Sequence, residues 1–373
     1  MKYCFVFLIL LSTFLAKAQK SILLVGTYTS GKSQGIYTYK FDNTTGDFIK
    51  LDSIKSSNPS FIAIAPNRKN VYAVNEDGNN NGLGGSVSAY KLDLQTGKLI
   101  LINTELSGGD HPCYLAVDKT GKWLTTGNYN GGNIAMMPIN QKDGSVGKAV
   151  MTKHTGSSVN IARQTKAHVH CTYFSENNKF LYVPDLGMDK VMIYNFNEKD
   201  GSLSATKQAF VKSDTGAGPR HITFSKNEKF GYLMEELTAT VNVFKQKNGE
   251  LISIQKIKAT PDTYTGKQGS ADIHVSPDGN FLYCSNRGES NTITIFKIEK
   301  KTGLLTYVDN TSTLGLTPRN FTIDATGNFL LVAHQKSDNV VIFKIDKLTG
   351  LLTDTGKRID VGNPVCLKMV ELR

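Results

Sequence analysis

The stretch NPSFIAIAPNRKNVYAVNE, residues 58–76, decides the fold. It contains two short apolar strands separated by a polar turn, and it shows no helical spacing. The same pattern returns along the chain at a mean spacing of about 51 residues. Further copies begin at His111, His168, Gly218, Ser270 and Thr317, and a truncated copy, NPVCLKMVELR, begins at Asn363.

Each repeat holds two more strands after this pair, which we name strands A and B. Strand C is typified by GIYTYKF at 35–41, and a TG, DG or NG turn then leads to strand D, typified by TGDFIKL at 45–51. Strands C and D each occur seven times. We therefore predict an all-β fold, a seven-bladed β-propeller with four antiparallel strands in each blade.

The two ends of the chain predict how the ring closes. SILLVGTYTS at 21–30 matches a strand B without a strand A before it, and NPVCLKMVE at 363–371 matches a strand A without a strand B after it. Pairing the N-terminal strands with the C-terminal strand completes the seventh blade and removes an exposed edge. We expect residues 19–373 to form one domain.

Residues 1–18 have the composition of a secretory signal peptide. A lysine at position 2 precedes an apolar run, and small residues lead to a cleavage site at Ala18. A membrane anchor is the alternative, but the run is shorter than the roughly 20 residues of a span. We expect a periplasmic or extracellular protein with no span in the mature chain. Four cysteines without paired spacing are expected to be buried free thiols: Cys113, Cys171, Cys284 and Cys366.

The charge of the chain favours an anionic small molecule over a nucleic acid. The formal net charge is +11, and it becomes +9 once Lys2 and Lys17 are removed. The basic residues are scattered singly, with no run of lysine and arginine interleaved with aromatics. No spacing requires a metal, although Asp272, His274 and Glu236 could hold a cation, and no cofactor motif is present. We expect no metal, no cofactor and a monomer.

Strand A lines the channel of a propeller, so its first residues are candidates for a site. One position into the strand, four of the seven repeats carry a charged residue or a histidine. Because side chains alternate along a strand, this position is expected to face the channel, and His221 is expected to point away. A polar ring that only hydrates the channel is the alternative. The series is Ser60, Cys113, His170, Arg220, Asp272, Arg319 and Val365.

The end of strand B lies at the same mouth of the channel as the start of strand A, because the two strands run antiparallel. The position before this end, which includes Glu235 and His334, carries residues that strand-ending turns prefer. This register favours Glu236 over Glu235 as the channel-facing carboxylate, and His170 over His168. The series at the end of strand B is Tyr28, Glu76, Tyr129, Leu186, Glu236, Arg287 and Gln335.

The motifs at this mouth resemble those of the seven-bladed propeller lactonases. That family includes the propeller-type 6-phosphogluconolactonases, and the fungal 3-carboxymuconate lactonizing enzymes are relatives. The resemblance spans the mature chain and rests on RQTKAHVHC at 163–171, GAGPRH at 216–221, YLMEEL at 232–237 and ADIHVSPDGNFLYCSNRG at 271–288. It implies a catalytic set of His170, Arg220, Glu236 and Arg287, although HVHC lacks the proline common between the two histidines.

These residues predict hydrolysis of a sugar-acid-type lactone. His170 or Glu236 would activate water, and Arg220 would stabilise the oxyanion. The long loop at 151–168 is expected to cover the site or to be a disordered surface loop. The alternatives are a muconate-type lactonizing reaction and an exported propeller that binds a ligand or protein without catalysis. The predicted substrate-binding residues are Arg319, Asp272, His168, Arg163, Glu76 and His334.

Overall fold

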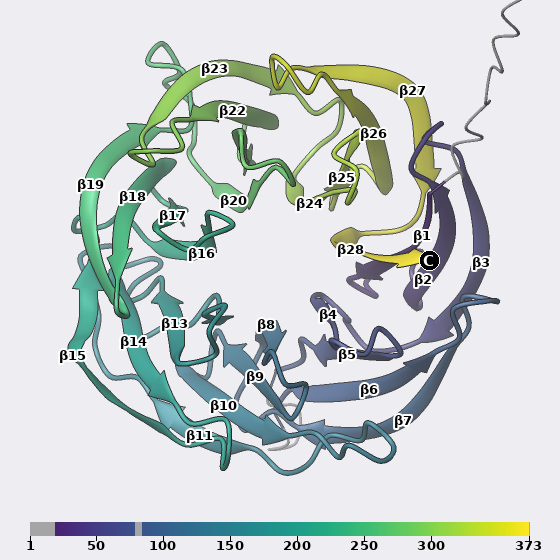
Figure 1. Ribbon diagram of the computed structural model, residues 1–373, viewed down its shortest axis with the longest axis horizontal. Helices are drawn as coiled ribbons and strands as arrows, with labels where there is room; N and C mark the ends of the chain where they lie inside the picture. The colour runs from purple at the N-terminus through teal and green to yellow at the C-terminus, as the bar shows by residue number, and fades with distance from the viewer. Residues whose placement is uncertain (1–18, 79–83, 373) are drawn as a thin grey trace, which may run out of the picture.

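The computed structural model describes residues 19–78 and 84–372. Twenty-eight strands form seven four-stranded antiparallel sheets around a central channel (Figure 1). No helix occurs in these two ranges, and so none that could cross a membrane. The predicted seven-bladed β-propeller is confirmed. The predicted signal peptide lies outside the described residues.

The blades follow one another in chain order, and each runs from the channel outward. Blade 1 is β28 (Pro364–Leu372), β1 (Lys20–Thr27), β2 (Gly35–Asp42) and β3 (Phe48–Lys55). Blade 2 is β4 (Ile62–Ile64), β5 (Asn70–Asn75), β6 (Ser86–Leu92) and β7 (Leu99–Leu106). Blade 3 is β8 (Pro112–Val117), β9 (Trp123–Asn128), β10 (Asn133–Pro138) and β11 (Val150–Lys153). Blade 4 is β12 (Tyr173–Phe174), β13 (Phe180–Asp185), β14 (Lys190–Phe196) and β15 (Leu203–Lys212).

The remaining three blades have the same order of strands. Blade 5 is β16 (Pro219–Phe224), β17 (Phe230–Glu235), β18 (Thr240–Lys247) and β19 (Glu250–Lys258). Blade 6 is β20 (Ser270–Val275), β21 (Phe281–Asn286), β22 (Thr292–Ile298) and β23 (Leu305–Ser312). Blade 7 is β24 (Pro318–Ile323), β25 (Phe329–His334), β26 (Asn339–Ile345) and β27 (Leu352–Asp360).

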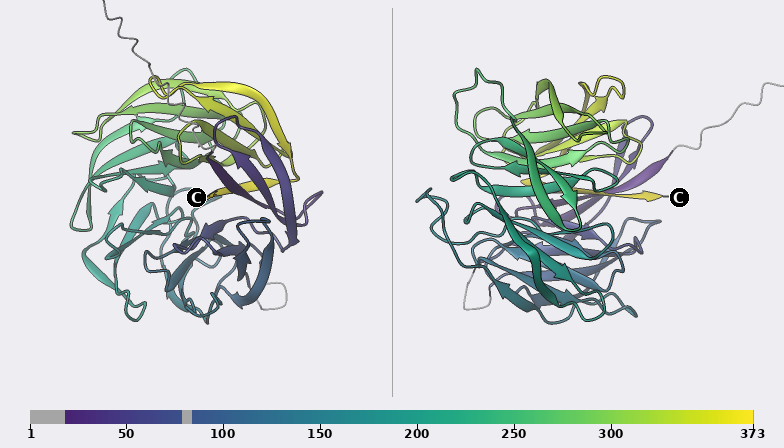
Figure 2. Two further views of the ribbon diagram at one scale, coloured as in Figure 1. Left: turned by 45° about the vertical axis from the view of Figure 1, so that its right-hand side comes forward. Right: turned by 60° about the vertical axis from the view of Figure 1, so that its left-hand side comes forward.

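The ring closes in blade 1, as predicted from the two ends of the chain. β28 pairs antiparallel with β1 from Lys20 and Leu372 to Thr27 and Pro364. Figures 1 and 2 show these two strands, yellow and purple, side by side. One blade therefore contains both ends of the described domain, and no inner strand is left unpaired.

The hydrophobic core lies between neighbouring blades. Tyr232 and Val243 of blade 5 pack in one buried cluster with Ile273 and Leu282 of blade 6. Apolar side chains on each sheet face thus meet those of the next sheet, as the alternation along each strand requires. The four cysteines are buried and unpaired, which confirms the prediction of free thiols.

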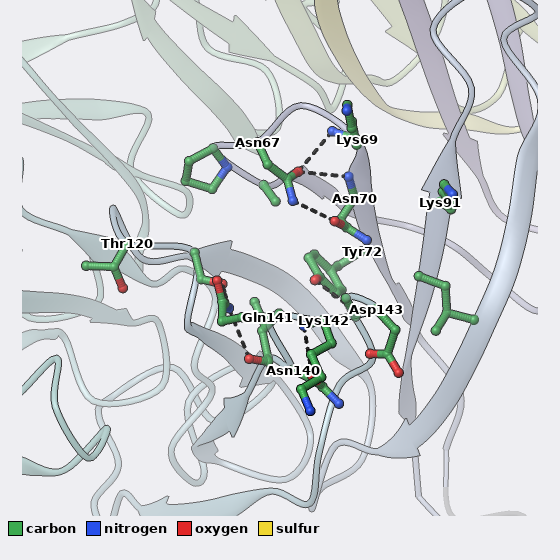
Figure 3. A pocket seen from close by; sticks show the side chains of 16 residues that line it. Asn67, Lys69, Asn70, Tyr72, Lys91, Thr120, Asn140, Gln141, Lys142 and Asp143 are labelled. Carbon is green, nitrogen blue, oxygen red and sulfur yellow. Dashed lines mark hydrogen bonds between the residues drawn. The ribbon is translucent and has the colours of Figure 1, made fainter.

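One contact between blades recurs five times and is altered at the other two junctions between blades. The first residue of strand B is an aromatic ring that lies against a left-handed glycine of the next blade, as Phe281 does on Gly350. At the junction of blades 1 and 2, Leu51 of strand D lies against Gly97 instead. In blade 2 the first residue of strand B is Asn70, which lies against Gly144. A cleft of about 520 Å³ opens beside Asn70 (Figure 3), whereas the matching cleft at Phe281 measures about 100 Å³.

We expect Asn70→Phe to stabilise the fold by about 1–2 kcal/mol, because the added ring buries apolar surface against Gly144. The strand register at this position matches that of blade 6, since Asn70 pairs with Lys91 as Phe281 pairs with Lys297. Chemical denaturation of this variant and of Asn70→Ala measures the gain. A variant less stable than the wild type would show that blade 2 cannot accept the ring.

Candidate active site

Strand A carries a β-bulge at its start, and this bulge changes which side chains face the channel. In blade 5, Pro219 pairs with Glu235 and His221 pairs with Met234, so Arg220 is an extra residue. A bulge directs two consecutive side chains to one side. The His221 ring accordingly lies 5.3 Å from the ring of His170 and hydrogen-bonds to Arg220. The expectation that His221 points into the blade is therefore wrong.

The bulge creates two layers of side chains in the channel. The upper layer is Ser60, Cys113, His170, Arg220, Ala271, Arg319 and Val365, and the lower layer is Phe61, Tyr114, Cys171, His221, Asp272, Asn320 and Cys366.

Asp272 belongs to the lower layer, which corrects its predicted place beside Arg220. Ser270 pairs with the last residue of strand B, Asn286, as Pro219 pairs with Glu235. Asp272 is therefore the equivalent of His221. The predicted register differs by one residue in blade 6, because Ser270 replaces the proline that marks the strand start in five of the other six blades.

A cavity of about 290 Å³ lies at the upper mouth, where strands A begin and strands B end. All seven blades or their connecting loops contribute to its wall. Six of the ten predicted site residues line it, together with two tyrosines and a cysteine that were in the aligned series without being proposed as site residues. The wall consists of Tyr28, Glu76, Cys113, Tyr129, Arg163, His170, Glu236, Arg287 and Arg319.

Glu236 is held by three arginines. Its Oε1 lies 2.7 Å from Nη2 of Arg163, and its Oε2 lies 2.8 Å from Nε of Arg220 and 2.9 Å from Nη2 of Arg287. Burial raises the pKa of this carboxyl, but the three guanidinium groups together outweigh burial and hold the pKa well below its usual range. Glu236 is therefore an ionised anchor for arginines and a weak proton acceptor.

Glu235 does not line the cavity. Its side chain is buried within the blade, and its Oε1 has no hydrogen-bond partner among the described residues. Burial raises the pKa of Glu235 to about 7. Of the two adjacent carboxyls, the structure places Glu236 at the mouth, where the register analysis had placed it.

His170 is the group in the cavity best suited to accept a proton. Burial, followed by the charge of Arg220, holds the pKa of His170 well below its usual value, so the imidazole is neutral at neutral pH. Its Nδ1 lies 3.8 Å from Sγ of Cys113, and its Nε2 has no hydrogen-bond partner within residues 19–78 and 84–372. A neutral imidazole with an available nitrogen can act as a general base.

The opposite wall of the cavity combines a carboxylate with an uncommitted arginine. Tyr28 donates a hydrogen bond of 2.8 Å to Oε2 of Glu76, and Ser60 donates to the same oxygen. Nη2 of Arg319 lies 4.0 Å from this oxygen, and its guanidinium group covers the ring of Tyr28. Arg319 makes no hydrogen bond with any described residue, so its donors can serve a ligand.

Arg163 reaches the cavity from the long loop, whose first residues, 151–153, belong to β11. The loop is fixed by Asp189, whose Oδ1 accepts a hydrogen bond of 2.7 Å from Gln164 and whose Oδ2 accepts one of 2.5 Å from Ser158. Arg163 also donates to the hydroxyl of Tyr129 at 3.1 Å. The loop is a hydrogen-bonded wall of the cavity.

Four predicted site residues lie outside the cavity wall. Arg220 belongs to the upper layer but is 1% exposed and does not line the cavity. Asp272 lies in the lower layer. His168 stacks on the ring of Tyr129, and its Nδ1 lies 2.9 Å from that residue's carbonyl oxygen. His334 is buried beside Asn339, because it occupies the position that Glu235 has in blade 5.

The fold and the cavity define a seven-bladed propeller with a strongly cationic site at one mouth of its channel. A family model described as "Lactonase, 7-bladed beta-propeller" matches residues 22–369. The chain therefore belongs to the seven-bladed β-propeller lactonase family.

Relatives and solved structures agree with this membership. The chain is 37% identical to a 6-phosphogluconolactonase of Formosa agariphila, over 85% of this chain and 90% of that protein. It is 36% identical to one of Bacillus subtilis, over 94% and 99%. A putative 6-phosphogluconolactonase of Bacteroides fragilis shares 40% identity with a TM-score of 0.89, over 94% and 98%. A periplasmic gluconolactonase of Pseudomonas aeruginosa shares 35% identity with a TM-score of 0.90, over 94% and 99%.

Proposed function

We propose that the protein hydrolyses a sugar-acid-type lactone in the cavity at the upper mouth. Family membership and the named relatives support lactone hydrolysis as the reaction. The observation that carries the location is that neutral His170 and the cationic side chains of Arg163, Arg287 and Arg319 line one cavity. A base and several fixed positive charges around one space are what ester hydrolysis needs.

In the proposed mechanism, Nε2 of His170 takes a proton from a water molecule, and the oxygen of that water molecule attacks the carbonyl carbon of the lactone. Arg163 and Arg287 stabilise the negative charge that develops on the carbonyl oxygen. The bond between the carbonyl carbon and the ring oxygen then breaks, and the His170 proton passes to the ring oxygen. The product is the open-chain hydroxy acid, whose new carboxylic acid group loses its proton to solvent and becomes a carboxylate.

The far wall suits the rest of such a substrate. Glu76 can accept hydrogen bonds from sugar hydroxyls, and Tyr28 and Arg319 can donate to hydroxyl or anionic oxygens. Arg220 is paired with Glu236 and does not line the cavity, so it acts on the substrate through Glu236, in place of the direct oxyanion contact predicted from the sequence. Glu236 keeps the arginines in place.

An assay of acid release tests the proposal directly. Purified protein is incubated with gluconolactone, its 6-phosphate and several simple lactones, and the rate is compared with spontaneous hydrolysis. We expect turnover of at least one sugar lactone, and Arg319→Ala should raise KM about tenfold by removing a charged hydrogen-bond donor. No turnover of any lactone would contradict the proposal and favour either the lactonizing reaction or a binding protein without catalysis.

We also propose that the protein is exported and monomeric after cleavage near Ala18. The apolar run of residues 1–18 supports export, as does the likeness to a gluconolactonase described as periplasmic. N-terminal sequencing of the protein from fractionated cells, together with light scattering of the purified protein, tests both statements. An uncleaved cytoplasmic chain or a stable dimer would contradict them.

A further inference from the structure

We infer that His221 and Asp272 form a buried positioning pair that orients Arg220 and, through it, Glu236 in the wall of the cavity. This inference rests on the proposed function. Neither residue lines the cavity, so each would act on the reaction only through another side chain.

A continuous chain of hydrogen bonds links Glu236 in the cavity wall to Asp272 in the lower layer. Arg220 donates from Nε to Oε2 of Glu236 over 2.8 Å and from Nη1 to the carbonyl oxygen of Ala271 over 2.5 Å. The same Nη1 lies 3.2 Å from Nε2 of His221, and Nδ1 of His221 lies 2.8 Å from Oδ1 of Asp272. Of the three guanidinium nitrogens, Nη1 is therefore held from outside the cavity, and Nε is held by the cavity carboxylate of Glu236.

The protonation states along this chain follow from its chemistry. Burial, then the charge of Arg220, lowers the pKa of His221 to about 3, so its ring is neutral. Arg220 has only donors, so Nε2 of His221 must accept and Nδ1 must carry the proton. The Nδ1 proton is donated to Asp272, whose carboxylate thus selects the tautomer that can hold Arg220.

Asp272 is suited to this role because its charge is fixed. Its Oδ2 accepts hydrogen bonds from Nε2 of His274 at 2.9 Å, from the amide of Phe321 at 3.3 Å and from the side chain of Asn320. Burial raises the pKa of Asp272, but His274 and His221 outweigh burial and hold it well below the usual range. With both oxygens occupied in the lower layer, Asp272 has little capacity to bind a substrate.

The substitution Asp272→Asn tests the inference. Three donors surround Oδ2, whereas Oδ1 meets one fixed donor, the backbone amide of Ile273, besides His221. The amide oxygen of the new asparagine is therefore favoured at the Oδ2 position, and its NH2 group faces Nδ1 of His221. His221 must then accept at Nδ1 and carry its proton on Nε2, where it opposes a donor of Arg220. We expect kcat to fall about 10- to 100-fold, a loss typical of removing a supporting hydrogen bond, with KM changed less than about threefold.

Asn320→Ala is the matched control. It removes a neighbour of Asp272 in the same buried layer but leaves the bond between Asp272 and His221 intact. We expect Asn320→Ala to lose about as much thermal stability as Asp272→Asn, but to keep kcat within about threefold of the wild type. If Asp272→Asn fails to fold, two variants of His221 provide the test instead. Glutamine can donate and accept hydrogen bonds, so His221→Gln should retain more activity than His221→Phe.

Imidazole ¹⁵N NMR gives a measurement that does not depend on turnover. It should show an Nδ1–H tautomer of His221 in the wild type, an Nε2–H tautomer in Asp272→Asn, and a shifted Nε–H signal of Arg220. Unchanged NMR signals, or unchanged kcat with a switched tautomer, would overturn the inference. A wild type without lactonase activity would instead refute the proposed function, and the NMR comparison would still decide whether the pair orients Arg220.

Discussion

Replacing His170 with alanine is expected to lower kcat for lactone hydrolysis by about 10²- to 10⁴-fold, with a small change in KM. The reason is that His170 is the neutral proton acceptor of the cavity wall, whereas Glu236 is bound by three arginines. Single-turnover and steady-state assays on a lactone that the acid-release assay shows to be hydrolysed measure the effect.

The pH dependence gives a second measurement of the same assignment. A base works when it is unprotonated, and the pKa of His170 is held well below 6.5 by burial and by Arg220. We therefore expect kcat/KM to stay nearly constant as the pH falls from 8 to 6.5, and to decline only at lower pH. A decline centred near 6.5 would contradict a buried His170 as the base.

His168→Gln is the matched control for His170. The two histidines belong to one motif, but the side chain of His168 stacks on Tyr129 outside the cavity. We expect this variant to keep kcat within about threefold of the wild type. If His168→Gln lost activity as severely as His170→Ala, lining the cavity would not distinguish the residues that take part in the reaction from those that do not.

Replacing Glu236 with glutamine is expected to reduce the free energy of unfolding by about 3–5 kcal/mol, because it leaves three arginines facing one another without their shared anion. The rate of lactone hydrolysis should also fall in this variant. Added sulfate should restore part of the stability, since a bound anion can replace the carboxylate. Denaturation with and without sulfate measures both effects, and an unchanged stability would contradict the central role of Glu236.

Glu235→Gln is the control for this substitution. Because burial raises the pKa of Glu235 to about 7, the native state binds a proton that the unfolded state releases above about 4.5. The wild type should therefore lose stability as the pH rises from about 4.5 to 7. Glu235→Gln should match the wild type near pH 5, exceed its stability at pH 8 and retain activity.

The repeat pattern was sufficient to predict the number of blades, the order of strands and the closure of the ring. It also placed His170, Glu236, Arg287 and Arg319 at one mouth, since residues at equal positions in equal repeats have equal surroundings. Strand D of blade 3 is an exception. The segment DGSVGKA at 143–149 has the strand D pattern, but the strand lies at Val150–Lys153, because the turn is followed by an isolated bridge between Ile139 and Val146.

Sequence alone determined the architecture, because hydrophobic periodicity and turn residues are local signals that each repeat carries in full. Only the tertiary structure decided which side chains share the cavity. The bulges in strand A reverse the expected alternation, turn His221 toward the channel and, with the corrected register, place Asp272 beneath Arg220. Such a bulge depends on the pairing of two strands, and the burial that sets the charge state of His170 depends on neighbours from several blades.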